Sequence, residues 1–273
     1  MVSRLDSLNS QFKSGPSNYN GGQVGPKKDD DIVIIGMART AMTRAKRGPQ
    51  RNTGIEAMLT PVLEKVAKQS GVDKKAVQDI VIGNVLAPGA GATNARMAMF
   101  LAGYPETTTI YTINRFCSSG LQAVATVADS IAAGNISIGI GGGFETMSNG
   151  AMMDQVKPDL LGEAVFENEK AQNCLMPMGI TSENVAAEYG ITREMQDTMA
   201  AESHAKAANA QKNGWLQSEI TPYETIVKDK DGNETKITVD KDDGIREGTN
   251  VAGLGKLKAA FQKGGSTTAG NSS

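Results

Sequence analysis

The feature that most limits the possible folds is an alternation of two kinds of segment between residues 31 and 150. Short apolar runs rich in β-branched residues are separated there by segments long enough to form helices. Runs of this length and composition are typical of buried strands. Strands that alternate with helices predict a layered α/β/α domain whose mainly parallel sheet is covered on both faces. The predicted strands are 32–38, 79–86, 108–113 and 136–141.

The segments between these strands carry start and stop signals for helices. Thr60 predicts an N-cap with Pro61 at the first helical position, and Gly71 predicts the end of that helix. A second amphipathic pattern covers residues 121–132 and ends before Gly134.

A smaller inserted α+β region is predicted from residue 151 to residue 265. Within it, a Lys-Asp-Gly-Asn turn at 230–233 predicts a β-hairpin over residues 225–240. Residues 266–273 then begin the return of the chain to the first domain. The helices predicted in the inserted region are 160–171, 181–189 and 192–213, the last with Thr192 as its cap.

Charge and hydropathy exclude several classes of partner. Charged residues form 21% of the chain and its formal charge is -2, so no strong field attracts nucleic acid or an anionic membrane. The longest apolar runs are far shorter than the roughly 20 residues that a membrane span needs. Two cysteines and one histidine are too few for a Cys/His metal site or a disulfide framework. We therefore expect no bound metal, no nucleic-acid partner, no membrane span and a reducing compartment.

Cys117 is the main candidate for a catalytic residue. It lies where a predicted strand gives way to an amphipathic helix. Unpaired amides and the positive end of the helix dipole at such a position lower the pKa of a thiol, and the same amides can stabilise an oxyanion. By position alone, a small buried core residue is an equally good interpretation.

A glycine-rich run near residue 140 allows two interpretations. Gly139 and the glycines at 141–143 resemble part of a dinucleotide-binding loop, but Phe144 stands where the last glycine is needed. Close packing of backbones is therefore the preferred explanation. Glu145, which follows, is predicted to be structural rather than a general base.

Several motifs resemble those of one enzyme family in the order in which that family has them. The segment 114–123, which includes Asn-Arg-Phe-Cys-Ser-Ser-Gly-Leu, is similar to the active-site signature of the thiolases. Phe116 replaces the glutamine that is usual before the cysteine. The peroxisomal 3-ketoacyl-CoA thiolases are closest to the whole pattern. Further matching segments are 83–85, 141–148, 177–185 and 268–273.

This resemblance implies a fold, an activity and a set of partners. It implies a thiolase-like core with an inserted loop domain, and thiolytic cleavage of 3-ketoacyl-CoA in fatty-acid β-oxidation through an acyl group on Cys117. Acyl-CoA and coenzyme A are then substrates, no cofactor is needed, and a homodimer is expected. Two alternatives remain: a biosynthetic acetoacetyl-CoA thiolase, and a non-catalytic protein that keeps the fold for binding or dimerisation.

The resemblance also implies contacts to coenzyme A. Met178 matches a residue beside the pantetheine and Arg246 matches one near the nucleotide. Ser273 is a better match than Ser272 to the serine of the Ala-Gly-Asn-x-Ser loop. Gly253 stands where many relatives have another contacting serine, so that contact is expected to be lost.

In the family, the activating histidine, the oxyanion site and a second catalytic cysteine lie in the second half of the chain. We therefore expect this sequence to be the amino-terminal part of a thiolase. His204 lies in the polar segment Glu-Ser-His-Ala-Lys and is expected on a solvated helix face. Cys174 is expected to be a packing residue.

Residues 1–30 are polar and are predicted to be a flexible tail. Arg4, Leu5, Gln11 and Phe12 are spaced as in the second type of peroxisomal targeting signal, which predicts a peroxisomal protein and an import receptor as partner. A plain tail, a cytoplasmic location or a mitochondrial presequence are alternatives, although Asp6 weakens the last of these.

Overall fold

The computed structural model describes residues 28–150 and 156–272. The chain divides into two compact units, Met1–Ile34 and Ile35–Ser273. The targeting signal predicted for residues 4–12 therefore lies outside the described residues. The described part of the first unit contains a turn in which the Asp31 amide donates to the Lys28 carbonyl oxygen at 3.2 Å.

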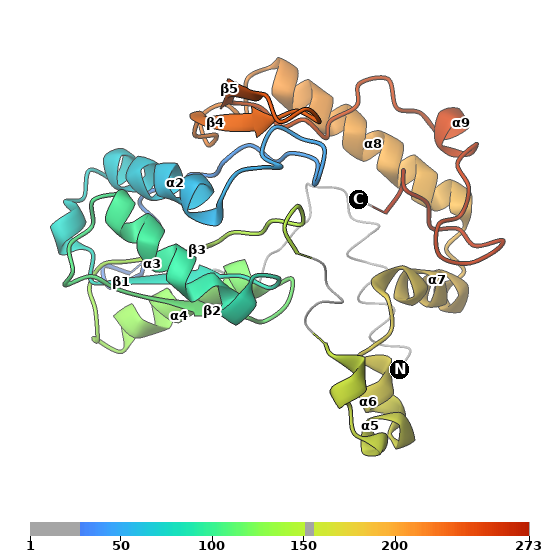
Figure 1. The fold of residues 1–273 in the computed structure, drawn as a ribbon, viewed down its shortest axis with the longest axis horizontal. Coiled ribbons are helices and arrows are strands. Elements are labelled where there is room, and N and C mark those ends of the chain that lie inside the picture. The colour runs from blue at the N-terminus through green and yellow to red at the C-terminus, as the bar shows by residue number, and fades with distance from the viewer. Residues whose placement is uncertain (1–27, 151–155, 273) are drawn as a thin grey trace. The chain divides into compact units, whose positions relative to one another are not determined.

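The second unit contains a three-stranded parallel sheet (Figure 1). Its strand order is β2-β1-β3, with bounds Asp79–Gly83 for β1, Thr109–Ile113 for β2 and Gly139–Gly143 for β3. Three of the four predicted strands are thereby confirmed. Ile80 and Ile82 of β1 point to one face of the sheet, whereas Val81 packs in a cluster on the other face.

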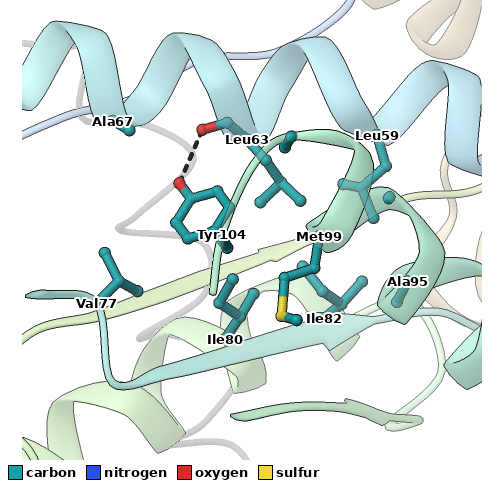
Figure 2. Close-up of a cluster of buried hydrophobic side chains, with 11 residues drawn as sticks. Leu59, Leu63, Ala67, Val77, Ile80, Ile82, Ala95, Met99 and Tyr104 are labelled. Atoms are coloured by element: carbon teal, nitrogen blue, oxygen red, sulfur yellow. Dashed lines mark hydrogen bonds between the residues drawn. The ribbon is translucent and has the colours of Figure 1, made fainter. Parts of the chain in front are cut away.

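Helices cover both faces, as predicted. On one face lie α2 (Ile55–Ser70) and α3 (Ala92–Leu101), and on the other lies α4 (Ser119–Ala132). Figure 2 shows the core between α2, α3 and the sheet, where the Tyr104 hydroxyl donates to the Leu63 carbonyl oxygen at 2.9 Å. Burial raises the pKa of Tyr104 to about 12, so the hydroxyl keeps its proton and remains a donor.

Helix α2 begins earlier than the sequence predicts. It begins at Ile55, so that Pro61 lies inside the helix and Thr60 is no cap. The Thr60 hydroxyl instead donates to the Glu56 carbonyl oxygen, one turn back, at 2.7 Å. Burial of Leu59 on the core face explains the extension, because packing overrides the local cap signal.

The strand predicted over residues 32–38 is wrong. No strand is assigned there, and Ile35 and Met37 are exposed. A strand needs a hydrogen-bonded partner, and the part of the chain that the structure describes supplies none to this segment. The Met37 amide donates to the Gln69 side chain instead.

The described region after residue 155 contains four longer elements, three short α-helices and a 3₁₀ turn at Pro158–Leu160. The helix predicted over 160–171 is divided at Asn168, whose side chain caps the second piece by accepting from the Ala171 amide. The helix predicted over 192–213 is confirmed, with Thr192 as its cap, and so is the hairpin. The elements are α5 (Glu163–Glu167), α6 (Glu169–Asn173), α7 (Met178–Tyr189), α8 (Arg193–Lys212), β4 (Tyr223–Lys228), β5 (Glu234–Val239) and α9 (Val251–Leu254).

An ion pair joins the segment before α2 to the segment after β5. The Arg39 guanidinium donates to both carboxylate oxygens of Asp242, at 2.8 and 2.9 Å, and to Glu219 at 3.0 Å. The Met42 amide also donates to Asp242 at 2.7 Å. Two distant parts of the sequence are therefore held together. Among the described helices, none has the length and apolar character needed to cross a membrane.

Candidate active site

Cys117 lies in the connection between β2 and α4, and polar side chains fix the shape of this turn. The Ser119 hydroxyl accepts from the Arg115 amide at 2.8 Å and donates to the Phe116 carbonyl oxygen at 2.6 Å. The Asn114 side chain accepts from the Phe116 amide at 2.9 Å. Side chains thus occupy backbone groups that neither strand nor helix can pair, and the Cys117 side chain is left exposed.

Phe116, directly before the cysteine, has a left-handed backbone. Its φ is 48°, a conformation that is strained for a residue with a bulky side chain. Its ring is 72% exposed, so packing of the ring does not compensate for the strain. The hydrogen bonds of Asn114 and Ser119 hold the backbone in this conformation and thereby set the direction of the thiol.

Glycines allow α4 to approach the sheet closely beside the cysteine. A Cβ atom on Gly83 would lie 2.5 Å from the carbonyl carbon of Ser119, and one on Gly141 would lie 2.6 Å from the Cα atom of Val124. Atoms at such distances would overlap, so only glycine fits at both positions. Close backbone packing, the preferred explanation of the glycine run, is confirmed.

The first turn of α4 can offer donors to a ligand. The amides of Gly120 and Leu121 have no acceptor among the described residues. Amides at this end of a helix are free to donate and lie at the positive end of the helix dipole. A negative charge that develops near Cys117 would therefore find hydrogen-bond donors close by.

Glu145 has a structural role, as predicted. Its carboxylate accepts from the amides of Val85 and Leu86, at 3.1 and 3.2 Å. Asn84, which is buried, donates to the same carboxylate at 3.3 Å and to the Phe144 carbonyl oxygen at 2.8 Å. These bonds fix the segments that follow β1 and β3.

A large cavity lies beside α8. Its volume is about 1110 Å³, and His204 and Ser272 are among the residues that line it. The segment around His204 is exposed, as predicted, but His204 itself is half-buried and its Nδ1 atom accepts from the Arg246 amide at 3.3 Å. Sequence patterns do not reveal this contact with the loop at Arg246. Cys117 and Met178 do not line the cavity.

A profile of the "Thiolase, N-terminal domain" family matches residues 32–273. The chain belongs to the thiolase family. It is 47% identical over 272 residues to a peroxisomal 3-ketoacyl-CoA thiolase of Yarrowia lipolytica, covering 100% of this chain and 65% of that relative. The corresponding human thiolase is 49% identical over 243 residues, covering 89% of this chain and 57% of the relative.

Two solved structures have the same fold. The dimeric peroxisomal thiolase of Saccharomyces cerevisiae has a TM-score of 0.78 at 35% identity, covering 89% of this chain and 61% of that one. The acetyl-CoA acetyltransferase of Bacillus anthracis has a TM-score of 0.74 at 32% identity, covering 88% and 61%. This thiolase chain therefore spans somewhat under two thirds of its relatives.

The residues expected to contact coenzyme A lie in different places. Met178 is the first residue of α7 and is 61% exposed, and Arg246 is exposed as well. Ser273 lies outside the described residues, whereas the Ser272 hydroxyl donates to the Thr268 carbonyl oxygen at 2.6 Å. A Cβ on Gly253 would have only one neighbour within 4 Å, at 3.5 Å, so a serine would fit there.

Cys174 is not a packing residue, contrary to prediction. It is exposed after α6, and its thiol lies 3.4 Å from the Lys170 carbonyl oxygen. Both cysteines of this thiolase are therefore accessible to reagents. Among the described residues, no group of three or more His, Cys, Asp or Glu side chains is placed to hold a metal ion.

Proposed function

We propose that the protein cleaves 3-ketoacyl-CoA thiolytically, in peroxisomal fatty-acid β-oxidation, with Cys117 as the nucleophile. The observation that supports this most directly is the exposed thiol on a turn fixed by Asn114 and Ser119, in front of a helix with free amides. Relatives named peroxisomal 3-ketoacyl-CoA thiolases, 47% and 49% identical, supply the substrate class.

The proposed reaction has two steps. The thiolate of Cys117 attacks the 3-keto carbon and forms a C–S bond. The bond between C2 and C3 then breaks, its electron pair leaves with acetyl-CoA, and a proton is taken up at C2. The thiol of a second coenzyme A attacks the acyl thioester, the C–S bond to Cys117 breaks, and the proton lost by the attacking thiol returns to the Cys117 sulfur. The amides of Gly120 and Leu121 are available to stabilise negative charge near the thiol.

Other parts of the proposal come from the family resemblance. The activating histidine, the asparagine–histidine oxyanion site and the proton-donating cysteine belong to the part of the relatives that this chain does not span. Met178, Arg246 and Ser273 are proposed to bind coenzyme A. The signal at residues 4–12 is proposed to engage a peroxisomal import receptor, which a fluorescent fusion with and without that segment would test.

A homodimer is part of the proposal, because the yeast relative is described as dimeric. The exposed side chains of Phe116 and Leu121, 72% and 74% accessible, provide an apolar surface beside β2. Sedimentation analysis of the chain and its Leu121→Glu variant tests this surface. Dissociation in the variant supports it, and an unchanged dimer contradicts it.

The catalytic proposal is tested by intact mass after brief incubation with a 3-ketoacyl-CoA or with acetyl-CoA. An acyl adduct should form on the parent chain and on Cys174→Ser, and should be absent from Cys117→Ser. Cys174→Ser is a matched control, because both thiols are exposed. An adduct that disappears only in Cys174→Ser, or no adduct on the chain or on a longer natural form, contradicts the proposal.

A biosynthetic acetyl-CoA acetyltransferase is the second candidate. The fold similarity to the Bacillus anthracis acetyl-CoA acetyltransferase, with a TM-score of 0.74, supports it. The two are distinguished by whether 3-ketoacyl-CoA substrates with long acyl chains acylate Cys117 as fast as acetoacetyl-CoA does.

A further inference from the structure

Two buried carboxylates hold the loop of residues 266–272. Glu183 of α7 accepts from the Ser266 amide at 2.9 Å and from the Thr267 amide at 2.8 Å. Asp197 of α8, which is 1% exposed, binds the other end of the loop through the side chain of Asn271. Arg193 and Asp197 form an ion pair one helical turn apart, in which the Asp197 carboxylate is buried and Arg193 is partly exposed.

The Asn271 side chain uses its hydrogen-bonding capacity within this loop. Its Oδ1 atom accepts from the Thr268 amide at 2.7 Å. Its Nδ2 atom donates to Asp197 at 2.9 Å and to the Ser266 carbonyl oxygen at 3.0 Å. A carboxylate can only accept, so Asp197 determines which end of the amide faces α8 and which end faces Thr268.

The Asp197 carboxylate is itself fixed. Its second oxygen accepts from Arg193 Nε at 2.8 Å. The same guanidinium donates to the carbonyl oxygens of Leu254 and Leu257, at 2.7 and 3.0 Å. A Cβ on Gly270 would lie 2.5 Å from Leu257, so the loop packs against the segment that Arg193 holds. A buried charge with its pairing and hydrogen bonds satisfied keeps one position.

We propose that Asp197 is a positioning residue for coenzyme A: through Asn271 it fixes the loop of residues 266–272, which lines the cavity beside α8 with Gly270 and Ser272. The proposal rests on the proposed function, because it assumes that this loop binds coenzyme A. Asp197 does not touch the substrate in this account. It acts only through the geometry of Asn271 and Thr268.

The test is a double-mutant cycle in the 273-residue chain, with Asp197→Ala, Asn271→Ala and both together. The first readout is the dissociation constant for coenzyme A, measured by calorimetric titration. The second is hydrogen exchange at the Thr268 amide, which should be slow in the parent because Thr268 is 0% exposed and donates to Asn271. Asp197→Asn replaces Asp197→Ala if the latter does not fold.

Tyr104→Phe is the control for lost stability. It removes one buried hydrogen bond in the core shown in Figure 2, away from the loop. Its melting temperature should fall, while the affinity for coenzyme A and exchange at Thr268 should stay unchanged. If Asp197→Ala only destabilises the fold, it should likewise lower the melting temperature and leave the affinity for coenzyme A and exchange at Thr268 unchanged.

The positioning role predicts that Asp197→Ala and Asn271→Ala each weaken coenzyme A binding by about tenfold and accelerate exchange at Thr268. The dissociation constant of the double variant should exceed that of the more weakly binding single variant by no more than about twofold. Both substitutions remove the same hydrogen bond between Asp197 and Asn271. Additive losses, or an Asp197→Ala variant that behaves like Tyr104→Phe, overturn the proposal.

Failure of the proposed function gives a different result. If the parent chain itself does not bind coenzyme A, the proposed coenzyme contact is contradicted. The role of Asp197 in coenzyme A binding then fails with it, and exchange at Thr268 reports only whether Asp197 orders the loop. If the parent binds coenzyme A and Asp197→Ala binds equally well, only the positioning role is overturned.

Discussion

The backbone of Phe116 offers a direct measurement of strain beside the nucleophile. Phe116→Gly and Phe116→Ala both remove the exposed ring, but only glycine adopts a φ of 48° without strain. We expect the glycine variant to be more stable than the alanine variant by about 1 kcal/mol. Urea denaturation of both measures the difference. At a site with negative φ the alanine variant would be the more stable of the two. A more stable alanine variant at position 116 would therefore contradict backbone strain there.

Thr221 carries a buried hydroxyl that has no hydrogen-bond partner among the described residues. Thr221→Val removes this polar atom and keeps the shape, so we expect stability to rise by about 1 kcal/mol. Thr53→Val is the matched control, because the equally buried Thr53 hydroxyl bonds to Thr225 at 2.6 Å. That variant should lose stability. A loss in both variants, measured by thermal unfolding, would sink this explanation.

The sequence identifies candidate reactive residues more reliably than it predicts their burial and contacts. The position of Cys117 on a turn between a strand and a helix is predicted because those patterns are local, but its role as the nucleophile is predicted only by the family resemblance. The exposure of Cys174 and the packing of His204 against Arg246 depend on contacts 42 residues away or on how short helices end, and local patterns do not contain this information. Asp197 is missed for the same reason, since its partner Asn271 is 74 residues distant.

At the scale of elements, the approach of α4 to β1 depends on Gly83. Gly83→Ala would place a methyl group against Ser119 and push the start of α4 away from the sheet. We expect a loss of about 1–3 kcal/mol, as for overpacking, together with weaker acylation of Cys117. Chemical denaturation and intact mass measure the two effects.

Gly142→Ala is the control for this prediction. Gly142 lies in the neighbouring strand opposite Ile82, and a Cβ there would have nothing within 4 Å. Its stability should stay within about 0.5 kcal/mol of the parent. Equal losses in both variants would show that general strand effects, and not the contact with Ser119, determine the result.

Elements with a strong periodic pattern are predicted well, and those that need a distant partner are not. The central strands, α8 and the hairpin follow from period, caps and turn residues. Residues 32–38 have the composition of a strand, but pairing is a long-range property and the described residues offer none. The start of α2 is mispredicted because the core contacts of Leu59 outweigh the cap signal at Thr60.

At the scale of the whole molecule, two carboxylates make the free energy of unfolding depend on pH. Hydrogen bonds from the Ser266 amide lower the pKa of Glu183, despite the opposing effect of burial. Burial alone would raise the pKa of Asp242, but hydrogen bonds from Arg39 and the Met42 amide outweigh it and the pKa is lowered. Both groups bind a proton more weakly in the folded chain than in the unfolded one.

Their contribution is therefore fully present above the ordinary carboxylate pKa of about 4, and is lost as the pH falls through the lowered values. We expect the free energy of unfolding to fall steadily below about pH 4. Glu183→Gln should give a flatter profile in this range, whereas Lys236→Gln, at an exposed hairpin pair, should keep the parent slope. Denaturation at a series of pH values tests this, and an unchanged slope in Glu183→Gln contradicts it.

The contact of bare backbone at Gly83 and Gly141 with α4 also limits how the sequence can change over evolutionary time. A mutation that adds any side chain there displaces the helix that follows the thiol, because the atoms in contact belong to the helix backbone. Lineages that keep the nucleophile should retain these two glycines, whereas Gly142, on the other face of the sheet, is free to change.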